Sequence, residues 1–238
     1  VGAIGGLVQI KTTRLLAYSS INHVGYILLA LYAAHIPCWL QSETLAYSAP
    51  SPLHIYGIGL YLLVYCFMTV NMFTVLYSLK FYKEKVTSMS PSAKVRADFI
   101  SGLKGLSALN PFLAASMAIT LLSMAGVPPL AGFVAKLTVY IGVLDSGAFA
   151  PAVFAVLCSV VSAVYYLRLI KVAYFYNDDS SLTSNKIVVA AVDKHKALDV
   201  IGGKMYLTSF ASNLISICTL LIIFFPIIRP QFIFLYLN

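Results

Sequence analysis

A single apolar run of 34 residues, from 111 to 144, restricts the folds open to this chain more than any other feature. As one straight helix it would be about 50 Å long, whereas the apolar core of a bilayer is about 30 Å thick. Gly126, Pro128 and Pro129 lie in the middle of the run. Proline cannot donate a backbone hydrogen bond, and its ring crowds the carbonyl four residues earlier. We therefore predict a membrane helix that breaks at 126–129, with open backbone groups that need protein or water around them.

One charged residue, Lys136, lies inside this run. It precedes Asp145, the first charge beyond the run, by nine residues, which places the lysine roughly 13 Å below the membrane surface. A lysine at that depth costs at least about 3 kcal/mol on insertion scales and usually marks an ion or proton pathway. The alternative is a lysine near a helix end whose amine reaches the surface, but the nearer surface is farther away than the side chain is long. We predict that Lys136 is a proton-relay residue.

The composition indicates an all-α membrane protein with many spans. Hydrophobic residues make up 60% of the chain and charged residues 10%, with a mean hydropathy of +0.88, far above what a soluble domain needs. The first apolar segment is half a span long, so we expect a chain that is truncated, processed or split from something longer. A short amphipathic surface helix is expected around 97–106. One transmembrane domain, 1–238, is predicted, with segments at about 1–10, 15–39, 55–79, 111–144, 150–167 and 205–228.

The basic residues alternate between the predicted loops. Of the 16 lysines and arginines, 14 lie in the first, third and fifth loops. This segregation is typical of loops that stay on the inner side of a membrane, and it places the C-terminus on the outer side. The net charge of +8 does not indicate a nucleic-acid partner, because the basic residues neither line one helix face nor interleave with aromatic residues.

The spans contain few other groups that could carry chemistry. No soluble-enzyme motif is present, and the four cysteines lack the spacing of metal ligands, so no metal or cofactor site is expected. No Asp or Glu lies in a predicted span. Lys136 is therefore either neutral for much of the time, since lost hydration favours the neutral amine, or its counter-charge comes from elsewhere.

Four further residues could extend a proton relay or hold a water wire: His23, Tyr65, Thr69 and Tyr140. Histidine gains and loses a proton near neutral pH. The alternative for His23 is a neutral side chain that is hydrogen-bonded between helices, and the hydroxyl groups are more often ordinary interhelical donors.

Three stretches together resemble subunit 2 of respiratory complex I, the proton-pumping NADH:ubiquinone oxidoreductase. They are RLLAYSSINHVGYILL at 14–29, LNPFLAASMAITLLSMAGVPPLAGFVAKL at 109–137 and SAVYYLRLIKVAYF at 162–175. The second is the most specific, since it combines Asn-Pro, Gly-x-Pro-Pro-x-x-Gly-Phe and a lysine three residues after that phenylalanine. The pattern extends from about residue 6 to 225.

This resemblance implies an antiporter-like subunit of fourteen helices, of which the chain would cover the end of helix 9 through helix 14. Lys136 would be the lysine of the family's central polar axis, on an interrupted twelfth helix. The family's glutamate on helix 5 and lysines on helices 7 and 8 have no counterpart here, which implies a separate chain with the N-terminal half or an incomplete one. Thr13 stands where many members have a basic residue beside Arg14.

The resemblance also implies a function. The chain would be a membrane-arm subunit of H⁺-translocating NADH:ubiquinone reductase in the mitochondrial inner membrane, with basic loops in the matrix and the C-terminus in the intermembrane space. NADH, FMN, iron–sulfur clusters and ubiquinone would be bound by other subunits. The implied partners are a chain with the N-terminal half, the neighbouring antiporter-like subunit 4 and lipids.

Two alternatives stay open, a subunit of a cation/proton antiporter and a purely structural membrane-arm scaffold. Copurification with NADH-oxidising subunits would separate the first from complex I. A scaffold would gain nothing from a buried lysine.

Overall fold

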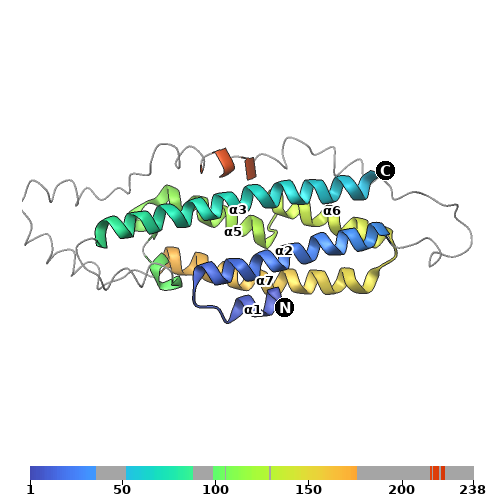
Figure 1. The fold of residues 1–238 in the computed structure, drawn as a ribbon, viewed down its shortest axis with the longest axis horizontal. Helices are drawn as coiled ribbons and strands as arrows, with labels where there is room; N and C mark the ends of the chain where they lie inside the picture. Colours follow the sequence, from blue (N-terminus) through green and yellow to red (C-terminus); the bar gives the residue numbers. More distant parts are fainter. Residues whose placement is uncertain are drawn as a thin grey trace, which may run out of the picture.

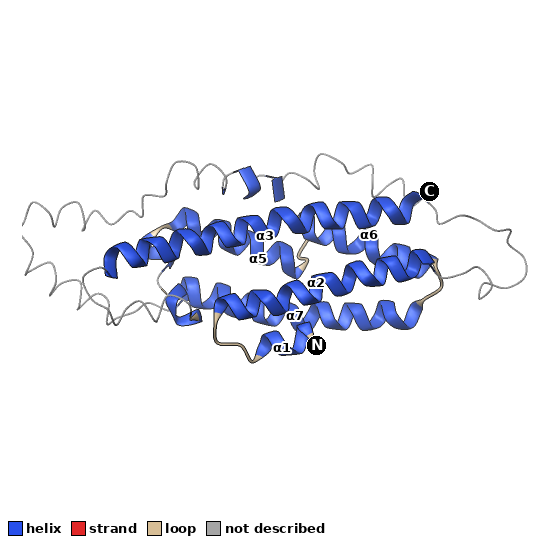
Figure 2. Ribbon diagram, in the orientation of Figure 1, coloured by secondary structure: helices blue, strands red, loops and turns tan. Residues whose placement is uncertain are grey.

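A computed structural model describes residues 1–35, 52–87, 99–104, 106–128 and 130–175, together with 215, 217–219 and 221–222. Within these ranges the regular structure is helical, apart from an isolated antiparallel bridge between Lys11 and Phe99, so the predicted all-α fold is confirmed (Figure 2). In chain order the elements are α1 (Gly2–Leu7), α2 (Thr12–His35), α3 (Pro52–Thr87), the 3-10 turn η3 (Ile100–Leu103), α4 (Leu106–Leu109), α5 (Pro111–Ala125), α6 (Ala131–Asp145) and α7 (Phe149–Phe175).

The long helices form one elongated bundle. Figure 1 shows α2, α3 and α7 along a common axis, with α5 and α6 following one another behind α3. Three described helices, Thr12–Ala34, Gly57–Lys80 and Phe149–Phe175, are long and apolar enough to cross a membrane. Most of the exposed large apolar side chains lie on these three helices, and such surfaces suit a lipid environment better than water.

The direction of the helices agrees with the alternation of the basic residues. Figure 1 shows the start of α2, the end of α3 and the end of α7 at the same end of the bundle. Lys11 precedes α2 directly, Lys80 lies in the last part of α3, and Arg168 lies near the end of α7. We call this the basic end of the bundle. At this end the Arg168 guanidinium donates to the Leu7 carbonyl at 3.3 Å.

Some helix bounds differ from the sequence-based expectation. α3 was expected at 55–79 and α7 at 150–167, but both helices continue for about two further turns. Apolar composition marks only the part of a helix that lies in lipid, whereas backbone hydrogen bonding continues into water. Where a short surface helix was expected around 97–106, the described residues form the turn η3 and the start of the single-turn α4, and Gly102 inside η3 opposes a continuous helix. Most of the predicted span 205–228 lies outside the described residues.

A polar contact joins two helices inside the bundle. Asn71 of α3 is fully buried and donates to the hydroxyls of Ser116 and Thr120 of α5, at 3.3 and 2.8 Å. Ser116 in turn donates to the side-chain amide oxygen Oδ1 of Asn71 at 3.4 Å. Such bonds fix how two apolar helices are rotated against each other.

We expect Asn71→Leu to reduce the stability of the bundle by about 1–3 kcal/mol, since interhelical hydrogen bonds in membranes contribute about 0.6–1.7 kcal/mol each. Thermal unfolding of the detergent-solubilised assembly measures this effect. The matched control is Thr74→Val on the same helix, because the hydroxyl of the half-buried Thr74 donates to the Val70 carbonyl of its own helix. Equal melting temperatures for the two variants would mean that the hydrogen bonds of Asn71 do not stabilise the contact between α3 and α5.

Candidate functional site

The break between α5 and α6 is formed by a tight helix end. Gly126 adopts the left-handed conformation, with φ of +90°, and its N–H donates to the carbonyls of Leu122 and Ser123 at 3.1 and 3.0 Å. Only glycine takes this conformation without strain from a Cβ atom. Pro128 follows in the turn, where it cannot continue the helix, and Pro129 lies outside the described residues. The predicted broken helix is confirmed.

The two half-helices touch through their backbones next to the break. The Gly132 N–H, in the first turn of α6, donates to the Ser123 hydroxyl of α5 at 3.0 Å. A Cβ atom on Gly132 would lie 1.9 Å from the Ser123 carbonyl oxygen, far inside van der Waals contact. Gly132 is the second glycine of the Gly-x-Pro-Pro-x-x-Gly-Phe motif, and its role in this close approach was not anticipated.

Lys136 lies buried against the end of α5. Its side chain is 5% exposed, and its amine donates to the Ala125 carbonyl at 3.0 Å. Ala125 is the last residue of α5, where carbonyls lack a partner within the helix and carry the negative end of the helix dipole. The amine also lies 5.3 Å from the centre of the Tyr26 ring, at a distance typical of a cation–π contact.

No fixed anion accompanies this amine in the described spans. Thr12–Ala34, Gly57–Lys80 and Phe149–Phe175 contain neither Asp nor Glu. A carbonyl and an aromatic face, both only partly negative, stand where a carboxylate would otherwise be expected. Such an environment stabilises a positive charge without locking the proton in a salt bridge.

We expect Gly126→Ala to displace Lys136 as well as strain the turn. A Cβ atom at this position would meet the Lys136 Cδ at 3.1 Å, in addition to the cost of about 1–2 kcal/mol for a left-handed non-glycine residue. Gly147→Ala is the matched control, because Gly147 has φ of +75° but open space around its Cα. Both variants should melt earlier than the parent, but only Gly126→Ala should lower proton transfer in the assembled protein. If the two variants transfer protons equally well, Gly126 has no part in positioning Lys136.

His23 lies fully buried where three helices meet. Its Nδ1 is 2.7 Å from the Tyr61 hydroxyl of α3, and its Nε2 is 3.2 Å from the Tyr166 hydroxyl of α7. Tyr65 stacks on the imidazole with a centroid distance of 4.7 Å, and Tyr166 also bonds to the Ser19 hydroxyl. This is a histidine hydrogen-bonded between helices. Because each hydroxyl can donate or accept, the same arrangement can also pass a proton through the ring.

The other predicted site residues lie on either side of this cluster. Thr69 bonds to the carbonyls of Tyr65 and Cys66 in its own helix. The Tyr140 hydroxyl is buried and makes no hydrogen bond in the structure, although its ring meets that of Tyr26 edge to face at 6.2 Å. Buried hydroxyls without a partner are rare and usually bind water.

Tyr26 connects the two groups and was not among the predicted residues. It is 3% exposed, and its ring centre lies 6.2 Å from that of His23 and 6.1 Å from that of Tyr61. The Lys136 amine lies over the same ring. The sequence could have indicated this residue, because Tyr26 follows His23 by three positions and residues three apart lie on the same side of a helix.

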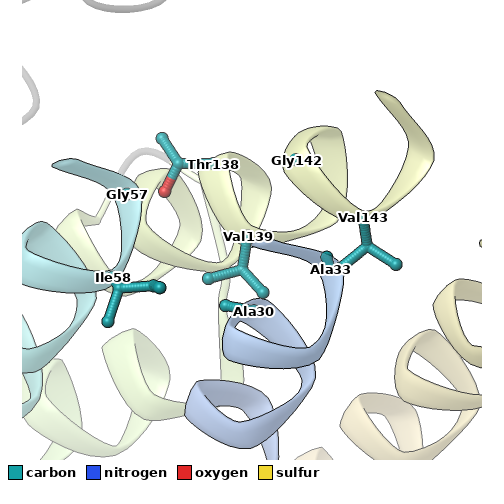
Figure 3. Close-up of a pocket in the computed structure, with 8 residues that line it drawn as sticks. All are labelled: Ala30, Ala33, Gly57, Ile58, Thr138, Val139, Gly142 and Val143. Atoms are coloured by element: carbon teal, nitrogen blue, oxygen red, sulfur yellow. The ribbon is translucent and has the colours of Figure 1, made fainter. Parts of the chain in front are cut away.

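A small cavity next to the site does not suit a ligand. Figure 3 shows it between α2, α3 and α6, with a volume of about 10 Å³. Thr138 supplies the only polar side chain, and that hydroxyl donates to the Ala135 carbonyl of its own helix. Small residues such as Ala30, Gly57 and Gly142 let the three helices approach closely here. Within the described part of the chain, no cluster of His, Cys, Asp and Glu could hold a metal ion.

Comparison with known proteins gives consistent matches. The family model described as NADH:quinone oxidoreductase/Mrp antiporter, TM, matches residues 1–162. NADH-quinone oxidoreductase subunit N of Rhodospirillum rubrum is 41% identical over 73% of this chain and 30% of its own length. NADH-ubiquinone oxidoreductase chain 2 of Rhizopus oryzae is 37% identical over 97% of this chain and 41% of its own length. The chain therefore spans 30% and 41% of the lengths of these two curated relatives.

Two solved structures share the fold. Respiratory complex I from Thermus thermophilus, solved with bound aureothin, contains a chain that matches with a TM-score of 0.62 at 24% identity, covering 97% of this chain and 41% of that one. The Mrp complex from Dietzia sp. DQ12-45-1b gives a TM-score of 0.57 at 23% identity, over 73% of this chain and 27% of that one.

Proposed function

The chain belongs to the NADH:quinone oxidoreductase/Mrp antiporter family of membrane proteins, as an antiporter-like subunit of the chain 2 or subunit N type, and we propose that it relays protons in the membrane arm of complex I. The relatives named as complex I subunits support this choice within the family. The chain spans less than half of the length of these relatives. We therefore propose proton translocation coupled to quinone reduction as an activity of the whole assembly that contains the chain.

The observation that carries the proposal is the Lys136 amine at the end of a broken helix. Burial removes the water that would stabilise its charge, while the Ala125 carbonyl and the Tyr26 ring partly replace that water. An amine held in this way can exist in either protonation state. Lys136 then acts as a station that accepts a proton and passes it on.

The remaining candidates have supporting roles. His23 is hydrogen-bonded to Tyr61 and stacked on Tyr65, and the Tyr140 hydroxyl, four residues after Lys136, is buried without a hydrogen-bond partner. Thr69 lies farther along α3, toward the basic end. Gly126 and Pro128 interrupt the helix, so that the Ala125 carbonyl is open to receive the amine.

The assembly would supply everything that the chain lacks. NADH, FMN, iron–sulfur clusters and ubiquinone would be bound by other subunits, and redox energy would arrive through electrostatic and conformational coupling. Its partners would be a chain with the N-terminal half, the neighbouring antiporter-like subunit 4 and lipids. Its place would be the mitochondrial inner membrane, with the basic loops in the matrix.

Purification of the native assembly through a tag on this chain tests the proposal. We expect it to oxidise NADH with quinone, to acidify vesicles and to contain, by mass spectrometry, a separate polypeptide with the N-terminal helices. An assembly without NADH-oxidising subunits that exchanges cations for protons would assign the chain to an Mrp-type antiporter instead, as the similarity to the Dietzia complex allows.

A further inference from the structure

The Tyr26 ring of α2 is fixed in place by contacts with three other helices. Its hydroxyl donates to the Ala155 carbonyl of α7 at 3.4 Å. The ring of Tyr61, on α3, lies 6.1 Å from it between centres, and the ring of Tyr140, on α6, lies 6.2 Å from it. Because these contacts come from different helices, the ring cannot turn away from α6 without losing contacts with α3 and α7.

This arrangement brings the face of the Tyr26 ring to the Lys136 amine. The amine lies over the ring, 5.3 Å from its centre. The neighbouring rings of His23 and Tyr140 meet Tyr26 at steep angles, with interplanar angles of 68° and 79°. An aromatic ring is negative on its face and positive at its edge, so the face is the part that attracts a cation.

The Lys136 amine depends on weak partners to hold its charge. Its hydrogen bond goes to the neutral Ala125 carbonyl at 3.0 Å. Asp145, the acidic residue of the same helix, follows nine residues later and therefore lies roughly 13 Å along the axis, too far away to pair. Tyr26 is 3% exposed and Lys136 is 5% exposed, so water does not separate them. At such a desolvated site, attraction to the ring favours the charged amine by roughly tenfold or more.

We propose that Tyr26 is a positioning residue, whose aromatic face takes the place of a carboxylate counter-ion and holds the charged Lys136 amine beside the Ala125 carbonyl. This inference rests on the proposed relay function and names the group that retains the amine in its proton-loaded state. Tyr26 gives and takes no proton in this role. Its ring is therefore required, whereas its hydroxyl is dispensable.

Two substitutions separate the ring from its hydroxyl. Tyr26→Phe keeps the aromatic face and removes only the hydroxyl, whereas Tyr26→Leu removes the face and keeps an apolar side chain. The ratio of protons moved to NADH oxidised is measured in vesicles that contain the assembled complex, together with the ratio for Lys136→Met. We expect Tyr26→Phe to keep the parent ratio, and Tyr26→Leu to lose at least half of what Lys136→Met loses.

A buried tyrosine elsewhere in the bundle controls for the lost volume. Tyr165 of α7 is fully buried, and its ring packs against Gly6 of α1, so Tyr165→Leu should leave the ratio unchanged. If Lys136→Met lowers the ratio but Tyr26→Leu does not, the proposal for Tyr26 is wrong and the relay function stands. An equal loss in Tyr26→Phe and Tyr26→Leu would assign the effect to the hydroxyl and also overturn the proposal. If Lys136→Met leaves the ratio unchanged, the relay function and this proposal both fail.

Melting temperatures of the same assembled complex test the contact itself. Tyr26→Leu lowers the melting temperature through lost volume and through lost attraction to the amine, but only the second part requires Lys136. In the Lys136→Met background, the shift caused by Tyr26→Leu should therefore be smaller, while the shift caused by Tyr165→Leu should be the same in both backgrounds. Equal shifts for Tyr26→Leu in the two backgrounds would show that the ring and the amine are not coupled, which overturns the proposal.

Discussion

Lys136→Met in the assembled enzyme is expected to abolish the proton movement that passes through this chain. Methionine matches the length of the lysine stem and fits the apolar surroundings, but it cannot hold a proton. The Ala125 carbonyl loses its partner, which costs about 1–3 kcal/mol, a loss that the large apolar core should tolerate. The ratio of protons moved to NADH oxidised should therefore fall in an enzyme that still assembles.

Two further variants make this test specific. Lys171→Met applies the same change to an exposed lysine at the basic end of α7 and should have no effect on the ratio. Lys136→Arg keeps the positive charge, but arginine does not release its proton, so a relay station should fail in this variant too. Normal pumping by Lys136→Arg together with failure of Lys136→Met would show that the charge matters and the transfer does not. Normal pumping by both would support a scaffold.

Gly132→Ala is expected to be among the most destabilising single changes in the described bundle. The added Cβ would meet the Ser123 carbonyl oxygen at 1.9 Å, so the first turn of α6 has to move away from the end of α5. Overpacking of this kind costs about 1–3 kcal/mol, and more where backbone meets backbone. The same shift breaks the Gly132–Ser123 hydrogen bond and moves Lys136, one turn later, away from Ala125.

The control for this substitution is Gly25→Ala. Gly25 lies within α2 and has no atom within 4 Å of the position of an added Cβ. Alanine is favoured over glycine inside a helix by about 1 kcal/mol, so this variant should melt at the same temperature or slightly higher. We expect a large loss of assembled protein and of thermal stability for Gly132→Ala alone. Similar melting curves for both variants would mean that the half-helices are not in contact.

The sequence was most informative where backbone chemistry decides the structure. Pro128 and Gly126 restrict the backbone whatever surrounds them, so the broken helix could be located from the sequence alone. The depth of Lys136 in a membrane was counted along the helix and remains a prediction, whereas its burial between the helices is observed. Its role as a relay remains a prediction, as do those of His23, Tyr65, Thr69 and Tyr140.

The sequence was least informative about which sides of the helices meet. In a membrane helix the inner and outer faces are both apolar, so periodicity does not indicate how the helix is rotated. The partners of His23 lie on α3 and α7, 38 and 143 residues away, and no local pattern connects them. The contact between Gly132 and Ser123 likewise depends on how two half-helices fold past one another.

The hydrogen bond between the Lys136 amine and the Ala125 carbonyl connects two separate helices, α6 and α5, rather than two turns of one helix. A hydrogen bond inside a helix keeps its length when the helix moves, whereas this one lengthens as soon as α5 and α6 slide apart. A displacement of about one ångström is enough to take a donor and acceptor out of bonding range. A movement of α5 relative to α6 would therefore change the proton affinity of the Lys136 amine.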